Sequence, residues 1–241
     1  PSPQINELRL RKSDAEILLM RHSAKIASQA HIQAMANTKP GVGEWQLEGI
    51  IEGVFKYCKS SGIAYPCIIG SGDNATILHY TVNNDTCDDG EVLLIDAGCE
   101  YRGYASDITR SWPVNGKFSE AQSEIYQLVL DSQEAAIAEC RVGNFYDAPH
   151  KTARRVLAEG LIRLGVISQP LDAALADDGE LNQWYMHNTG HWLGLDVHDV
   201  GVYQPDGEPR LLEEGMVMTV EPGLYFGAWR PDVDCPPRYA N

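Results

Sequence analysis

The chain has 241 residues, of which 34 are acidic and 19 basic, so its formal net charge at pH 7 is −15. A charge of this sign repels phosphate backbones, and the sequence has no basic stripe, which argues against a nucleic-acid partner. No apolar run approaches the roughly 20 residues needed to cross a bilayer, so membrane insertion is not expected. The six cysteines form no C-x-x-C pair and nothing signals secretion, which predicts free thiols in a cytoplasmic protein.

Two helices are predicted in the first sixty residues. Ser13 begins a capping box with Glu16, and the run then continues without Pro or Gly, so the first helix is expected over 13–37. The second is expected from about 44 to 60, because its apolar residues fall on one broad face and Gly62 follows soon after.

From residue 65 to 112 the hydrophobic pattern changes to that of short β-strands. The strand candidates are Ile77 to Thr81, Val92 to Asp96 and Tyr104 to Ser111.

Two more helices and further strands are predicted in the second half. Ser119 forms another capping box with Gln122 and begins a helix that ends near Cys140. A fourth helix is expected over about 146–164, and strands are expected again over 185–226.

The order of two helices, strands, two helices and strands suggests an internal repeat. Residues 90–98 align with 215–223, since both segments carry Gly, Val, a branched apolar residue, an acid and Gly at matching places. Each half therefore delivers one carboxylate at a strand end, Asp96 in the first and Glu221 in the second. If a pseudo-two-fold axis relates the halves, these like charges meet near the axis and require a cation.

Asp96 and Asp107 flank a predicted hairpin. With a turn centred between Tyr101 and Arg102, the two acids would lie directly opposite each other on one sheet face. Opposed carboxylates repel, so such a pair is costly unless it shares a proton or binds a metal. Two acids with a nearby imidazole are a recognisable set of divalent-cation ligands.

Three of the seven histidines, His187, His191 and His198, fall within twelve positions. Glycines within the run disfavour a helix and no Glu follows His187, so this is not the H-E-x-x-H zinc helix. Histidines in a glycine-broken, apolar strand region are costly to bury without a role. His79 is a fourth candidate, with a structural histidine as the alternative interpretation.

Taken together, these motifs resemble one family. Asp96 lies in Leu-Ile-Asp-Ala-Gly, Asp107 in Ser-Asp-Ile-Thr-Arg and Glu221 in Val-Glu-Pro-Gly-Leu-Tyr, with the histidine run before the last. The set looks like the catalytic domain of Xaa-Pro aminopeptidase (aminopeptidase P), in the dinuclear metallopeptidase family that includes prolidase, methionine aminopeptidase and creatinase. The resemblance implies an α+β, pita-bread (creatinase/aminopeptidase) fold, with two pseudo-symmetric αα-plus-β halves around an antiparallel sheet.

The resemblance also implies a metal centre. Asp96 would chelate one of two divalent metal ions and Asp107 would bridge both, with His191 and Glu221 completing the ligation. Oxygen-rich ligation with one imidazole favours Mn²⁺, with Co²⁺, Zn²⁺ or Fe²⁺ as substitutes.

The implied reaction releases the N-terminal residue from peptides with proline at the second position, by attack of a metal-bridging hydroxide. Glu221 would accept the proton of the water and pass it toward the leaving nitrogen. His187 and His198 would contact the scissile peptide and the tetrahedral species, and His79 and Tyr225 would line the same site.

Two departures from the family pattern are expected. Family members carry an N-terminal domain, and a further Glu ligand on a strand that follows the Glu-Pro-Gly loop. Residues 1–241 are therefore expected to be a pita-bread catalytic domain that lacks the N-terminal domain and ends before the strand with the further Glu ligand. Asp232 and Asp234 could replace the missing Glu, but the prolines around them favour a loop.

Two other functions stay open at this point: a prolidase that acts on X-Pro dipeptides, and a pita-bread binding module without catalysis. The 241-residue segment could also be inactive by itself without its fifth ligand. The expected partners are peptides with N-terminal X-Pro, and the family's frequent dimers and tetramers make a homo-oligomer an open question.

Overall fold

The computed structural model describes residues 3–230 and 235–239, which form two compact units. The first unit contains the described residues up to Ser119 together with 192–201 and 215–217. The second contains 120–191, 202–214 and the described residues from 218 onward. The predicted histidine run is therefore divided, with His198 in the first unit. Asp232 and Asp234 lie outside the described residues.

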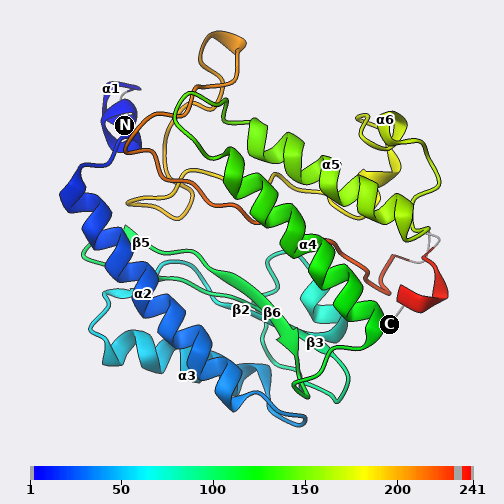
Figure 1. Ribbon diagram of the computed structural model, residues 1–241. Helices are drawn as coiled ribbons and strands as arrows, with labels where there is room; N and C mark the ends of the chain where they lie inside the picture. The colour runs from blue at the N-terminus through cyan, green and yellow to red at the C-terminus, as the bar shows by residue number, and fades with distance from the viewer. Residues whose placement is uncertain (1–2, 231–234, 240–241) are drawn as a thin grey trace. The chain divides into compact units, whose positions relative to one another are not determined.

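Three helices belong to the first unit (Figure 1): α1 (Pro3–Leu10), α2 (Asp14–Asn37) and α3 (Glu44–Tyr57). The capping box at the start of α2 is confirmed, because the Ser13 N–H donates to the Glu16 carboxylate at 2.7 Å and the Glu16 N–H donates back to the Ser13 hydroxyl at 3.5 Å. The sequence predicted α2 and α3 but missed α1.

Six short strands of the first unit form two three-stranded antiparallel sheets. One sheet has the order β1 (Gly62–Ile63), β4 (Cys99–Tyr101), β5 (Tyr104–Ala105), and the other the order β2 (Ile68–Ser71), β3 (Val92–Asp96), β6 (Thr109–Pro113). The prediction of a strand over 92–96 is confirmed. The predicted strand over 104–111 is interrupted, since residues 106–108 belong to neither β5 nor β6.

The predicted strand over 77–81 is wrong. A 3-10 helix, η1 (Gly72–Thr76), is followed by irregular chain in which His79 has φ of +56°. The apolar pair before His79 gave the appearance of a strand, but Ile77 and Leu78 are 43% and 46% exposed and pack into no core cluster.

The hairpin that carries the acid pair turns one residue later than predicted. Tyr101 pairs with Tyr104, and the turn residues Arg102 and Gly103 both have positive φ, 52° and 89°. Positive φ at both central positions is the signature of a type I′ turn, whose twist matches that of the flanking strands. Asp96 consequently pairs with Thr109 and is not directly opposite Asp107.

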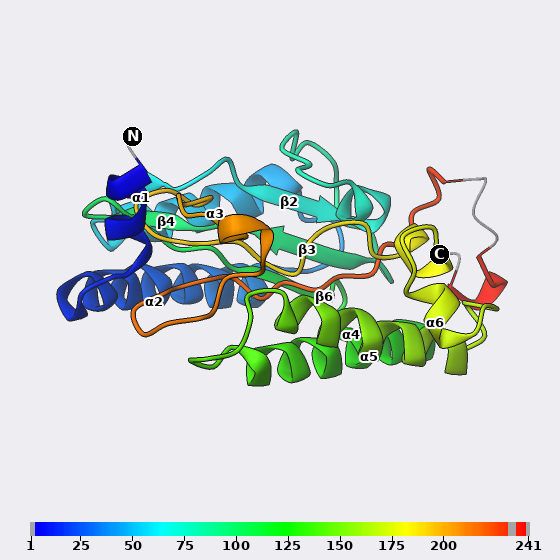
Figure 2. The ribbon, with the colours of Figure 1, turned by 90° about the horizontal axis from the view of Figure 1, so that it is seen from above.

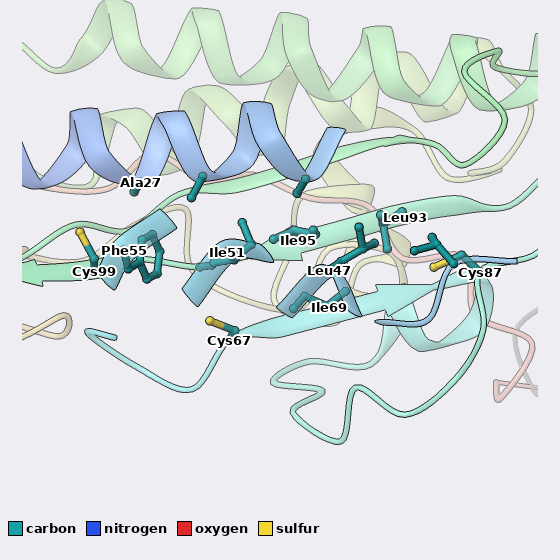
Figure 3. Packing of buried hydrophobic residues seen from close by; sticks show 14 of the residues in the cluster. Ala27, Leu47, Ile51, Phe55, Cys67, Ile69, Cys87, Leu93, Ile95 and Cys99 are labelled. Carbon is teal, nitrogen blue, oxygen red and sulfur yellow. The ribbon is translucent and has the colours of Figure 1, made fainter. Parts of the chain in front are cut away.

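The core of the first unit lies between its helices and the sheet. Leu47, Ile51 and Phe55 of α3 are spaced by four residues and are at most 2% exposed. Figure 3 shows these side chains beside Ile69 of β2 and Ile95 of β3, which are fully buried. Burying one such aliphatic side chain contributes about 1.5–3 kcal/mol, so this cluster holds the sheet that carries Asp96.

The second unit is built on two packed helices, α4 (Glu120–Glu139) and α5 (Ala148–Arg163), which lie side by side in Figures 1 and 2. Both helices were predicted from the sequence. Gly160 permits their close packing, because a Cβ at this position would overlap the side chain of Leu128 on α4. The smaller α6 (Leu171–Ala174) and the 3-10 turns η2 (Glu180–Gln183), η3 (Pro205–Gly207) and η4 (Pro237–Tyr239) complete the unit.

The strands expected over 185–226 are not assigned as such in the described residues, which show isolated bridge residues instead, as between Phe145 and Leu211. Two segments of the second unit nevertheless run antiparallel. The Thr219 N–H donates to the His191 carbonyl at 2.9 Å, and the Glu221 N–H donates to the Thr189 carbonyl at 2.7 Å. These segments therefore hold fixed positions through backbone pairing, although the pairing is too sparse to form a regular ladder.

All six cysteines are free, as expected. Among the described residues, no helix combines the length and hydropathy that a membrane span requires.

A buried group of charges joins the N-terminal part of the first unit to its 192–201 segment. The Lys12 ammonium lies 3.0 Å from the Asp199 carboxylate, and these side chains are 1% and 0% exposed. Arg9 contacts the other oxygen of Asp199 at 2.5 Å and reaches Asp196 at 2.7 Å. Removing one charge of a buried ion pair leaves the other charge buried without compensation, which strongly destabilises the fold.

Replacing Lys12 by Met should therefore lower the free energy of unfolding by roughly 3 kcal/mol, the low end for breaking a buried ion pair, since Arg9 still contacts Asp199. Urea denaturation measures this difference. Lys151→Met is the matched control, because Lys151 is 73% exposed in its pair with Asp147 and should contribute less than about 1 kcal/mol. Equal effects of the two substitutions would contradict the assignment.

Candidate functional site

The acid pair of the first unit is joined by a tyrosine hydroxyl. Asp96 is the last residue of β3, and Asp107 lies between β5 and β6 on the returning arm of the same hairpin. The Tyr65 hydroxyl is 2.5 Å from Asp96 Oδ1 and 2.8 Å from Asp107 Oδ1. The shifted turn moved the register by two residues, and since the side-chain period of a strand is two, the acids still face the same side.

Tyr65 supplies one proton to two carboxylates. Burial raises the pKa of Tyr65 well above its usual value, and the charges of Asp96 and Asp107 raise it further, so the phenol stays protonated at neutral pH. A hydroxyl has a single hydrogen to donate, whereas two neighbouring carboxylates carry two negative charges. This pair of acids therefore has the chemistry that suits a divalent cation.

Gly98 allows the two arms of the hairpin to approach at this point. A Cβ on Gly98 would overlap the carbonyl oxygen of Ser106, the residue before Asp107. The Ser106 N–H also donates to the Cys99 carbonyl at 2.9 Å. Glycine in the Leu-Ile-Asp-Ala-Gly motif is thus required by close backbone contact beside the acids.

The second unit brings together His191 and Glu221. His191 Nε2 lies 3.2 Å from Glu221 Oε1, and both side chains are part-buried. The Thr219 hydroxyl orients the pair, because it donates to Glu221 Oε1 at 2.7 Å and accepts from the His191 N–H at 3.0 Å. Gly190 has the role here that Gly98 has in the first unit, since its Cβ would overlap the Thr219 carbonyl oxygen.

His187 and Tyr225 also lie together in the second unit. His187 Nδ1 is 2.8 Å from the Asn188 carbonyl oxygen, which can only accept, so Nδ1 carries the proton. In the neutral imidazole, Nε2 then accepts from the Tyr225 hydroxyl at 2.8 Å. The rings meet edge to face with centroids 5.4 Å apart. This contact holds the His187 ring in one tautomer and one orientation.

His150 hydrogen-bonds Thr189, in the segment that carries His187 and His191. It was not singled out by the sequence analysis. Its Nδ1 lies 2.9 Å from the Thr189 hydroxyl and accepts from the Thr189 N–H at 3.2 Å, and the same hydroxyl lies 2.5 Å from that of Tyr185. Burial, together with the positive charge of Arg154, lowers the pKa of His150 to about 4. His150 is therefore a neutral acceptor at neutral pH.

His198 and His79 are exposed residues of the first unit, each on irregular chain. His198 immediately precedes the buried Asp199, so the ion cluster fixes the backbone next to it. His79 lies on the segment that follows η1. The predicted substrate roles of His198 and His79 stay predictions.

The structure thus groups the predicted site residues in pairs within each unit: Asp96 with Asp107, His191 with Glu221, and His187 with Tyr225. The residues missed by the sequence analysis, namely Tyr65, Thr219, His150 and Lys12, are those that orient these pairs or their segments. Lys12 and Thr219 stand near recognised motifs, but nothing local distinguishes Tyr65, which is 31 positions from Asp96.

The sequence profile of metallopeptidase family M24 matches residues 18–234. The chain belongs to metallopeptidase family M24. It is 46% identical to Xaa-Pro aminopeptidase of Escherichia coli over 237 residues, which are 98% of this chain and 53% of that protein. It is also 41% identical to the mouse Xaa-Pro dipeptidase, over 93% of this chain and 49% of that protein.

Solved structures agree with the family assignment. An aminopeptidase from Pseudomonas aeruginosa superposes with a TM-score of 0.90 at 45% identity, over 92% of this chain and 50% of that one. Zinc-substituted E. coli aminopeptidase P in complex with product superposes with a TM-score of 0.93 at 46% identity, over 98% and 53% of the two chains. The predicted α+β pita-bread fold is therefore confirmed. This M24 chain spans about half the length of the curated relatives it matches.

If Asp96 and Asp107 hold a divalent metal ion, replacing Tyr65 by Phe should weaken the binding of added Mn²⁺ by about 10–100-fold, the usual cost of removing a hydrogen-bond partner of a metal ligand. Isothermal titration calorimetry measures the affinity, and circular dichroism checks that the fold is kept. Tyr57→Phe is the control, because Tyr57 is 89% exposed and should leave the affinity unchanged. Unaltered binding by the Tyr65 variant would show that the hydroxyl does not orient the acids.

The depressed pKa of His150 predicts a pH dependence of stability. The folded pKa is about 4 and the unfolded value about 6.5, so between these limits the unfolded chain binds a proton that the folded chain does not. Stability that is present above pH 6.5 is lost as the pH falls through this window. His150→Gln should lose less stability than the unaltered protein when urea denaturation is repeated at pH 7 and pH 4.5. An NMR titration that placed the His150 pKa near 6.5 would contradict this.

Proposed function

We propose that the protein is a metal-dependent aminopeptidase that releases the N-terminal residue from peptides with proline at the second position. The observation that carries the proposal is that each unit holds a pair of side chains suited to metal ligation, each pair contacted by a hydroxyl. Tyr65 contacts Asp96 and Asp107, and Thr219 contacts Glu221 beside His191. The 46% identity to an Xaa-Pro aminopeptidase supports the choice of reaction.

The residues that would hold the divalent ions are Asp96, Asp107, His191 and Glu221. Three carboxylates and one imidazole are an oxygen-rich set, which favours Mn²⁺ over softer ions. When bound, the two ions supply Lewis acidity, which lowers the pKa of a coordinated water and polarises the peptide carbonyl.

The side chains of the chain itself would handle the proton and the substrate. Glu221 is the proposed general acid and base, and the Thr219 hydroxyl on its Oε1 orients it for this role. The proton must reach the prolyl nitrogen, which becomes a secondary amine as the bond breaks. His187 would bind the substrate through Nε2. The Tyr225 hydroxyl donates to this nitrogen, so it would have to move away, or the hydrogen bond would have to reverse so that Nε2 donates. His198 and His79 would contact the substrate from the first unit.

A prolidase is the second candidate, and the 41% identity to the mouse Xaa-Pro dipeptidase favours it. The two activities differ in substrate length. Hydrolysis of X-Pro dipeptides and of longer X-Pro peptides by the Mn²⁺-loaded protein should be compared, and we expect cleavage of the longer peptides. Cleavage of dipeptides alone would replace the aminopeptidase proposal by the prolidase. A binding module without catalysis would cleave neither. Self-association and a cytoplasmic location stay predictions.

Asp107→Asn should abolish turnover, because an amide replaces a charge that two cations would share, and it should leave the far-ultraviolet circular dichroism unchanged. Asp131→Asn is the matched control, since Asp131 is an exposed acid of α4 that accepts only from the neighbouring Gln127 in the contacts described. Peptide hydrolysis and Mn²⁺ affinity are the two measurements. Full activity of the Asp107 variant would show that the ligand assignment is wrong.

A further inference from the structure

Glu44 is a fully buried carboxylate at the first position of α3. Four donors converge on it. The Ser71 N–H and the Asn74 side-chain amide donate to Oε1 at 2.9 and 3.1 Å, and the Tyr80 hydroxyl and the Asp85 N–H donate to Oε2 at 2.9 and 3.0 Å. Its position in the first turn of the helix adds the favourable field of the helix N-terminus.

These donors come from a single segment, residues 71–85, which after Ser71, the last residue of β2, contains no β-strand. Ser71 ends β2 and Asp85 lies just before the bridge that joins Thr86 to Gly43, so the two donating backbone groups mark the two ends of the segment. Asp85 is held twice, because its carbonyl also accepts from the Glu44 N–H at 2.9 Å. One buried side chain therefore closes the loop at both ends.

His79 lies near the middle of this loop, next to Tyr80. Its φ of +56° is a left-handed conformation that residues other than glycine rarely adopt. Such a conformation persists only when surrounding contacts hold it, and it occurs preferentially at functional sites. Tyr80 makes two contacts beside His79: its hydroxyl donates to Glu44 Oε2 at 2.9 Å, and its N–H donates to the Ile77 carbonyl at 3.3 Å. The side chain of His79 itself is exposed and available to a ligand.

From these observations we infer that Glu44 is a positioning residue for His79. The buried carboxylate gathers the ends of the 71–85 loop and the Tyr80 hydroxyl, and so presents the His79 imidazole to the substrate in one orientation. This inference rests on the proposed function only for what His79 binds.

Glu44→Gln keeps the shape of the side chain but replaces one acceptor oxygen by a donor amide, so two of the four donors lose their acceptor. Tyr80→Phe is a milder second variant that removes one donor and is expected to fold even where the first does not. Glu52→Gln, an exposed acid of the same helix, is the matched control.

The first measurement is the ¹H–¹³C NMR signal of the His79 ring in the metal-free protein. It should shift or broaden in Glu44→Gln and in Tyr80→Phe and stay unchanged in Glu52→Gln. This result does not depend on activity, so it separates the inference from the proposed function. An unchanged His79 signal in both test variants would overturn the inference.

The second measurement is a double-mutant cycle on hydrolysis of an X-Pro peptide with Mn²⁺ bound. Glu44→Gln should lower kcat/KM about tenfold or more in the unaltered protein, and Tyr80→Phe by a smaller factor. Both effects should disappear when His79 is already Ala, because a positioning residue acts through its target. Equal losses in both backgrounds would show that Glu44 is merely structural. Absence of hydrolysis by the unaltered protein would count against the proposed function and leave the NMR result to decide the inference.

Discussion

A carboxylate removed from water must be met by donors or by cations, and this constraint shapes the parts of the molecule that carry its candidate site. Asp199 is met by the charges of Lys12 and Arg9. Glu44 is met by four neutral donors. Asp96 and Asp107 share the single hydroxyl of Tyr65, and such a pair of like charges is further stabilised by a divalent cation.

Asp199 and Glu44 each hold a segment that carries an exposed histidine. Asp199 is adjacent to His198, and the Glu44 donors enclose the loop with His79. Irregular chain is needed where a side chain must face a ligand, yet it lacks the hydrogen bonds of a helix or sheet. A buried charge that collects backbone groups gives such chain a defined conformation.

The two units hold their candidate ligand residues in similar ways. In each, a glycine lets one backbone segment approach another beside the candidate ligands, Gly98 near Asp107 and Gly190 beside His191. In each, a hydroxyl fixes a carboxylate, from Tyr65 in the first unit and Thr219 in the second. The internal repeat predicted from the sequence thus extends to the way the candidate ligands are held, although the described residues of the second unit form no regular strand there.

Local signals in the sequence were enough to determine the four long helices α2 to α5 and the acid-bearing strand. A capping box and an uninterrupted run define α2, and a short continuous run of apolar residues defines β3, because both depend on neighbours within a few positions. The motifs around Asp96, Asp107, His191 and Glu221 likewise predicted the family. The tertiary structure alone decided the turn at Arg102 and Gly103, the loss of the expected strand at His79, and the partners Tyr65 and Glu44. The Tyr65–Asp96 and Glu44–Tyr80 contacts span 31 and 36 positions of chain, for which the local pattern carries no signal.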